Sequence, residues 1–223
     1  AAKPEMETLR AALRTDREAL KTALAAATPD PCVVGAAFLK VDADLKAIFD
    51  DVILSPSAFN LQQWAFVVVR EAEQKKRLRA ASMDQAQVEN CGAAIVVCAK
   101  LDAHVDAPTI FAQAPEPMRE RMIGMTGQMY GGNAQFARDE AIRGASLAAM
   151  TLMYAAKARG FDTGAMIGFN PQQVAEVAGL TDNYIPAMLI VMGRGTPPAT
   201  PRGYRKPVGE VVKLERLDGA GLA

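Results

Sequence analysis

The sequence predicts an α+β domain in which helices wrap a central sheet. A chain of 223 residues is long enough to bury a substantial core and short enough to form one domain. Amphipathic helical patterns recur along it and are separated by only a few short apolar runs typical of buried strands. No internal repeat is evident. Many helices interleaved with few strands are typical of the α+β class.

The first half of the chain predicts three helices and two strands. Leucines recur at helical spacing over residues 5–27, which form one helix or two helices that break near Thr15 and Asp16. The elements expected next are an amphipathic helix over 41–54, a strand over 64–70, a helix over 72–81 and a buried strand over 93–99.

The second half predicts a methionine-rich helical segment and then a long alanine-rich helix. Residues 108–132 carry a row of methionines that is more typical of adaptable core or of a lid than of a cofactor site, namely Met118, Met122, Met125 and Met129. The alanine-rich helix covers 134–159 and ends at Gly160, and small residues at 144–149 permit close packing. A short helix over 171–178 and a strand over 187–192 complete the expected elements.

Charge and composition exclude several classes of function. Lys plus Arg and Asp plus Glu both number 25, so no net field attracts nucleic acid or an anionic membrane. The longest nearly apolar stretch, 144–156, is too short to span a bilayer, and the charged first residues do not resemble a signal peptide. We therefore expect a cytoplasmic protein with no nucleic-acid or membrane partner.

The inventory of reactive residues also limits the chemistry. The three cysteines form no CxxC pair, and the single histidine, His104, is interpreted as an ordinary loop residue. A histidine-rich metal site or a His-dependent triad is therefore not expected, and no metal is predicted. Neither GxxxxGK[ST] nor a strand-linked GxGxxG occurs.

A polar turn, SPSAFNLQQW, directly precedes the strand at 64–70. Its hydroxyl and amide groups exceed what a connection requires, so we expect the turn to hold a ligand that is polar and flat. Taken alone, Asn60 and Gln62 are better explained as residues that cap a helix and satisfy backbone groups in a turn.

The turn resembles the PS-x-x-N-x-Q-P-W signature of the FMN-dependent nitroreductase family, with Gln63 in place of the proline. Three further segments resemble the family in the expected order: DQAQVENCGAAIVVCAK, the helix and loop ASLAAMTLMYAAKARGFDTGAMIGFN, and the basic ending RGYRKPVGEVV. The resemblance covers about residues 41–212. It divides the chain into a helical extension, 1–31, and a nitroreductase-like domain, 32–223.

The resemblance implies a sandwich with a mixed or antiparallel sheet, in an intertwined homodimer that binds one FMN at each of two interface sites. The alanine-rich helix would pack against its twin through residues 144–149. The chemistry belongs to the flavin, so no catalytic side chain is assigned. The implied partners are NAD(P)H and a small electron acceptor, such as a nitroaromatic or a quinone, which react in turn by a ping-pong hydride relay.

Carried over residue by residue, the resemblance assigns contacts with FMN to four segments. The turn would reach the flavin from the partner subunit, Asp84 and Gln87 would meet the pyrimidine edge and ribityl chain, Ile167 and Gly168 would lie near N5, and the basic ending would bind the phosphate. The cofactor-binding residues are Pro56, Ser57, Ala58, Asn60, Gln62, Asp84, Gln87, Ile167, Gly168, Arg205 and Lys206.

One segment departs from the family pattern. The family's R-R-S-x-R-x-F motif, which holds the phosphate and the N1 side of the flavin, corresponds to 32–38, and this segment has no basic residue. Arg10 and Arg14 reproduce the arginine spacing farther upstream. Two hypotheses follow: an FMN-dependent NAD(P)H oxidoreductase, or a non-catalytic relative that binds flavin weakly or holds another small ligand in the same pocket.

Overall fold

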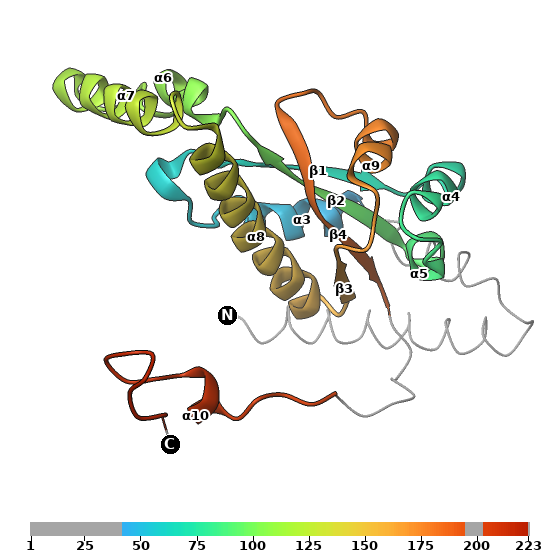
Figure 1. The fold of residues 1–223 in the computed structure, drawn as a ribbon. Coiled ribbons are helices and arrows are strands. Elements are labelled where there is room, and N and C mark those ends of the chain that lie inside the picture. The colour runs from blue at the N-terminus through green and yellow to red at the C-terminus, as the bar shows by residue number, and fades with distance from the viewer. Residues whose placement is uncertain (1–41, 195–202, 223) are drawn as a thin grey trace, which may run out of the picture.

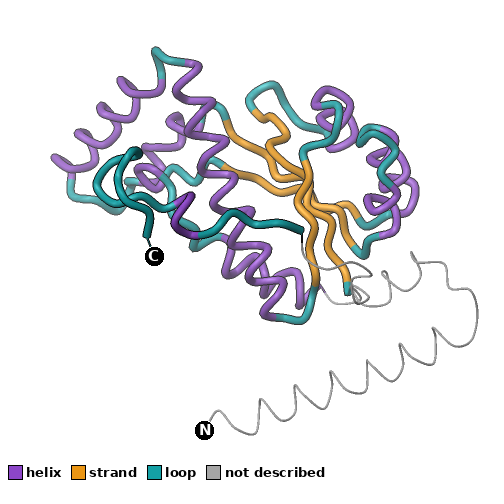
Figure 2. Tube along the Cα trace, turned by 60° about the horizontal axis from the view of Figure 1, so that its bottom comes forward, coloured by secondary structure: helices purple, strands orange, loops and turns teal. Residues whose placement is uncertain are grey.

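The computed structural model describes residues 42–194 and 203–222. Within them a four-stranded antiparallel sheet lies between two layers of helices (Figures 1 and 2). The elements are α3 (Asp42–Val52), η1 (Ala58–Asn60), β1 (Trp64–Val69), α4 (Ala72–Ala80), α5 (Ala86–Asn90), β2 (Ala93–Lys100), η2 (Ala103–Asp106), α6 (Ala107–Ile110), α7 (Glu116–Tyr130), α8 (Ala134–Ala158), β3 (Asp162–Met166), α9 (Pro171–Ala178), β4 (Tyr184–Gly193) and α10 (Val208–Val211). The α+β prediction is confirmed.

The strand order is β1-β2-β4-β3, which places β2 and β4 in the centre of the sheet. All but the last residue of β2 are buried, so the strand is apolar on both faces. Register pairs such as Ile95 with Ile190 join the central strands. A bulge interrupts this pairing next to Pro186, a residue that has no amide hydrogen to give to the ladder.

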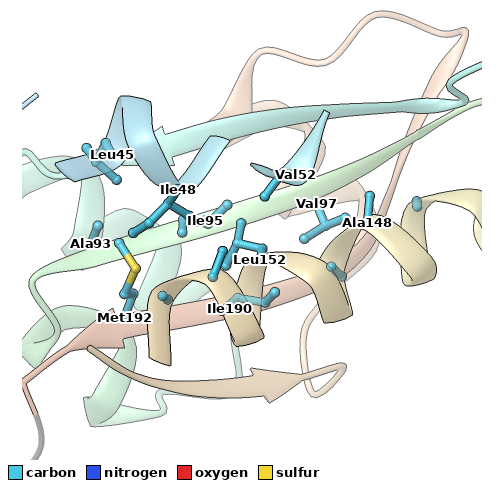
Figure 3. Close-up of a cluster of buried hydrophobic side chains, with 14 of the residues drawn as sticks. Leu45, Ile48, Val52, Ala93, Ile95, Val97, Ala148, Leu152, Ile190 and Met192 are labelled. Carbon is cyan, nitrogen blue, oxygen red and sulfur yellow. The ribbon is translucent and has the colours of Figure 1, made fainter. Parts of the chain in front are cut away.

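Alternate residues of the central strands face two different cores. On one face, α3 and α8 cover the first core, in which Ile48, Ile95 and Leu152 are fully buried (Figure 3). On the other face, α4, α5 and α9 cover the second core, which includes Leu78, Val88 and Val174. Because successive side chains of β2 point to opposite faces of the sheet, this one strand packs against both helical layers.

The structure changes several expected boundaries. The strand expected at 187–192 runs from Tyr184 to Gly193, and the expected helix over 108–132 is divided into α6 and α7. The sequence prediction did not include β3 or α5. The helix expected over 5–27 lies outside the described residues.

The packing of α8 corrects one expectation. Gly144, Ala145, Ala148 and Ala149 are buried inside the protomer, where α8 packs on the sheet and on α3. The small residues therefore cannot face a twin helix, because their side of α8 is already covered. Their function is to let α8 approach its own sheet closely.

The opposite side of α8 carries an exposed apolar stripe. Leu147, Met150 and Tyr154, spaced like one helical face, are 45%, 43% and 67% exposed. Beside them the turn that follows α3 exposes Ile53 and Leu54, and a hydrogen bond of 2.9 Å between the hydroxyls of Ser55 and Thr151 joins this turn to α8. No helix in the described ranges is long and apolar enough to cross a bilayer.

Candidate flavin site

The turn at 55–62 adopts a strained backbone between α3 and β1. Phe59, Asn60 and Gln62 have φ values of 55°, 53° and 50°, in the left-handed region that residues other than glycine rarely occupy. The Ser57 hydroxyl accepts a hydrogen bond of 2.9 Å from the Gln62 amide hydrogen, and Leu61 is buried beneath the turn. Strain of this kind, held in place by local contacts, is typical of binding sites.

The predicted binding side chains of the turn are accessible to a ligand. Pro56, Asn60 and Gln62 are exposed, while Ser57 and Ala58 are half-buried. The Gln62 side chain donates to the backbone carbonyl of Asn60 at 3.1 Å, and the side chains of both residues belong to exposed positions. Their donors and acceptors fit the edge of a flavin ring.

The residue that replaces the signature proline is buried. Gln63 is 3% exposed, and both polar atoms of its amide lack a hydrogen-bond partner among the described residues. A Cβ added at Gly144 would come within 2.9 Å of Oε1 of Gln63, so the glycine leaves the space that this amide occupies. Gln63 also borders a small cavity with His104 and Tyr130, whose rings stack at a centroid distance of 6.3 Å. His104 is thus half-buried in η2.

A second group of predicted residues lies in the loop between α4 and α5 and in α5 itself, away from the turn (Figure 1). Asp84 and Gln87 are exposed there, and Met83 and Asp84 have φ values of 52° and 54°. Arg79 contacts the Asp84 carboxylate at 2.8 Å and that of Glu89 at 2.9 Å. Two hydrogen bonds raise the pKa of the Arg79 guanidinium. The larger effect comes from Glu89 and the next from Asp84.

The predicted residues Ile167 and Gly168 come directly after β3 and lie against this second group. The side chain of Gln85 donates to the Gly168 carbonyl at 2.8 Å. Ile167 is 76% exposed and Met83 75% exposed, so both apolar side chains are open to a ligand. The sequence prediction did not include Gln85, Met83 or Arg79. Their only signal was their position in the polar segment that precedes β2.

The predicted phosphate ligands Arg205 and Lys206 are exposed in the segment before α10. Among the described residues, the Arg205 guanidinium donates to nearby backbone, the carbonyls of Gly203 and Tyr204, at 3.2 and 2.9 Å. In Figure 1 this segment lies apart from the sheet. The segment 32–38 and the pair Arg10 and Arg14 lie outside the described residues.

The protomer thus separates the predicted residues into groups. The turn at 55–62 precedes β1, whereas the loops at 81–85 and 167–170 meet on the side of the sheet that α4, α5 and α9 cover, away from the turn (Figure 1). One protomer brings Asp84, Gln87, Ile167 and Gly168 together and does not bring the turn to them.

The chain resembles proteins of known structure, and it also matches the model of one protein family. The fold matches a protein from Exiguobacterium sibiricum described as a "putative nitroreductase in complex with FMN", with a TM-score of 0.72, 28% identity, and coverage of 78% of this chain and 87% of that one. The family model "Nitroreductase family" matches residues 13–194. The chain belongs to the nitroreductase family of oxidoreductases.

Curated relatives agree with this assignment. The chain is 37% identical over 178 residues to the Bacillus subtilis protein named "Putative NAD(P)H nitroreductase MhqN", covering 76% of this chain and 86% of the relative. It is 30% identical to a protein of Thermus thermophilus named "NADH dehydrogenase", covering 75% of this chain and 83% of the relative.

Proposed function

We propose that the protein is an FMN-dependent NAD(P)H oxidoreductase that relays a hydride through the flavin to a nitroaromatic, a quinone or a similar small acceptor. The observation that carries the proposal is the strained turn at 55–62, which presents the amides of Asn60 and Gln62 to solvent in the family signature. The likeness to a relative solved with FMN supports the same cofactor.

When bound, FMN supplies the hydride-transfer chemistry. The residues of this chain bind and orient it. The amides of Asn60 and Gln62 hydrogen-bond the ring edge, and Asp84 and Gln87 meet the pyrimidine and ribityl groups from the second group of residues. Met83 and Ile167 offer apolar contacts that exclude water beside the ring. Arg205 and Lys206 neutralise the phosphate.

The site requires a homodimer. The turn and the loop group lie apart in one protomer (Figure 1), so a flavin that touches both must lie between two copies. The exposed stripe of Leu147, Met150 and Tyr154, extended by Ile53 and Leu54, is the surface we propose for the second copy. Contiguous apolar surface of this kind is typical of permanent interfaces.

A non-catalytic protein that binds flavin weakly is the second candidate. It is favoured by the segment 32–38, which has no basic residue where the family has arginines. Losing two charge-assisted hydrogen bonds, at ~1.5–3 kcal/mol each, weakens FMN binding by two decades or more. The pocket would then hold FMN only at high concentration, or another small planar ligand.

One experiment tests both candidates. The purified full chain is titrated with FMN while flavin fluorescence is followed, and the loaded protein is then mixed anaerobically with NADH or NADPH and a quinone. Quenching together with pyridine nucleotide oxidation supports the oxidoreductase. Quenching of flavin fluorescence without oxidation of NADH or NADPH supports the second candidate. Absence of quenching refutes flavin binding, and with it both candidates as flavoproteins.

A further inference from the structure

The side chain of Gln85 links the two loops that carry the predicted residues Asp84, Ile167 and Gly168. Loop 81–85 connects α4 to α5, and loop 167–170 connects β3 to α9. The Gln85 amide nitrogen donates to the Gly168 carbonyl at 2.8 Å and to the Ser82 carbonyl at 3.1 Å. A backbone bond of 2.8 Å from Asn170 to Ala81 adds a second link. Gln85 is therefore the side chain that joins both loops.

The backbone that Gln85 fastens is strained. Met83 and Asp84 are consecutive residues other than glycine in the left-handed region, at a cost of order 1–3 kcal/mol each. Such a conformation persists only where its surroundings hold it. Arg79 holds Asp84 through its carboxylate and its carbonyl, and the side chain of Gln85, the next residue, fixes the loop to the carbonyls of Ser82 and Gly168.

The contact between the two loops is tight. A Cβ added at Gly168 would lie 3.0 Å from the Gln85 amide nitrogen and 3.6 Å from the Met83 sulfur. The Gln85 side chain is half-buried behind the exposed side chains of Met83 and Ile167. Its amide oxygen accepts from the Gln87 side chain at 3.4 Å. One half-buried amide thus contacts residues of both loops.

We propose that Gln85 is a positioning residue that holds the two flavin-facing loops in a single arrangement, so that Asp84 and Gln87 meet one edge of the isoalloxazine while Ile167 and Gly168 meet its N5 side. The inference rests on the proposed function, because it assigns the ring to this surface. Donation to two carbonyls requires the amide N–H groups, which neither glutamate nor methionine can supply.

The test uses the full chain with Gln85→Glu and Gln85→Met, and with Gln172→Glu and Gln172→Met as matched controls on an exposed glutamine of α9. Titrations with FMN and with riboflavin, the midpoint potential of the bound flavin, and hydrogen exchange of the flavin-free protein are measured. We expect both Gln85 variants to lose about tenfold in affinity for both flavins, to shift the midpoint potential, and to exchange faster at 82–85 and 167–170. The controls should match the wild type.

The outcomes separate this proposal from the proposed function. Wild-type protein that binds neither flavin refutes the proposed function and this inference with it. Wild-type binding with unchanged affinities and potential in both Gln85 variants overturns the inference alone. Loss of FMN with riboflavin affinity retained also overturns it, because the effect would then lie at the phosphate. If one variant fails to fold, the other decides the result.

Discussion

Replacing Gln63 by methionine should stabilise the protein. The Gln63 amide is buried, and neither its donor nor its acceptor has a partner among the described residues. Leaving a buried polar group unpaired costs about 1–3 kcal/mol, whereas methionine has a similar length, no strongly polar group and an adaptable shape. We expect the free energy of unfolding to rise by about 2 kcal/mol, which corresponds to roughly 4–8 °C in Tm for a chain of this size.

The assay is urea unfolding followed by tryptophan fluorescence. Trp64 is the single tryptophan of the chain and adjoins Gln63 in the sequence, so it reports on this region directly. The midpoint should rise at unchanged slope. Gln128→Met, at an exposed position of α7, is the control and should change stability by less than about 0.5 kcal/mol. A lower midpoint for Gln63→Met would refute the reasoning, since it would mean that the amide is hydrogen-bonded in the folded protein.

Three further predictions address the phosphate, the interface and a buried thiol. Arg205→Ala should weaken FMN by about one to two decades and leave riboflavin unchanged in paired fluorescence titrations; equal losses would assign Arg205 to the fold. Leu147→Glu should convert a dimer to a monomer in light scattering, and a retained dimer would place the interface elsewhere. Burial raises the pKa of the Cys98 thiol to about 12. Above about pH 9 this thiol ionises in the unfolded chain but not in the folded protein, so the free energy of unfolding should fall by roughly 1.4 kcal/mol per pH unit. Urea unfolding at pH 8 and pH 10 should show a larger loss of stability in the wild type than in Cys98→Val, and equal losses would refute the prediction.

The sequence predicts the elements whose own residues specify them. Strand β2 is a continuous apolar run, and α8 has a long helical pattern with Gly160 directly after its end, so both were predicted nearly to their observed bounds. Strand β3 was not predicted, because Asp162 and Gly164 have low strand propensity and the strand exists by pairing with β4. Its stability comes from a partner that is distant in the sequence.

The site could be predicted only in part for a related reason. The signature at 55–62 is local, so its polar side chains were identified directly from the sequence. The contact of Gln85 with Gly168 joins two loops far apart in the sequence, and a single sequence contains no sign of it. The face of α8 that packs on the sheet was also misjudged, because small residues permit close packing against any neighbour and only the tertiary structure shows which one.

The strand order has a consequence for how the chain folds. The two central strands, β2 and β4, are separated in the sequence by every element from η2 to α9, so their pairing closes a very long loop. During synthesis β2 emerges well before its central partner and can pair only with β1 until the end of β4 has left the ribosome. We therefore expect slow folding limited by this late pairing. Until then the apolar run Ala93–Ala99 is an open strand edge, and it is the segment most prone to aggregation in a truncated or stalled chain.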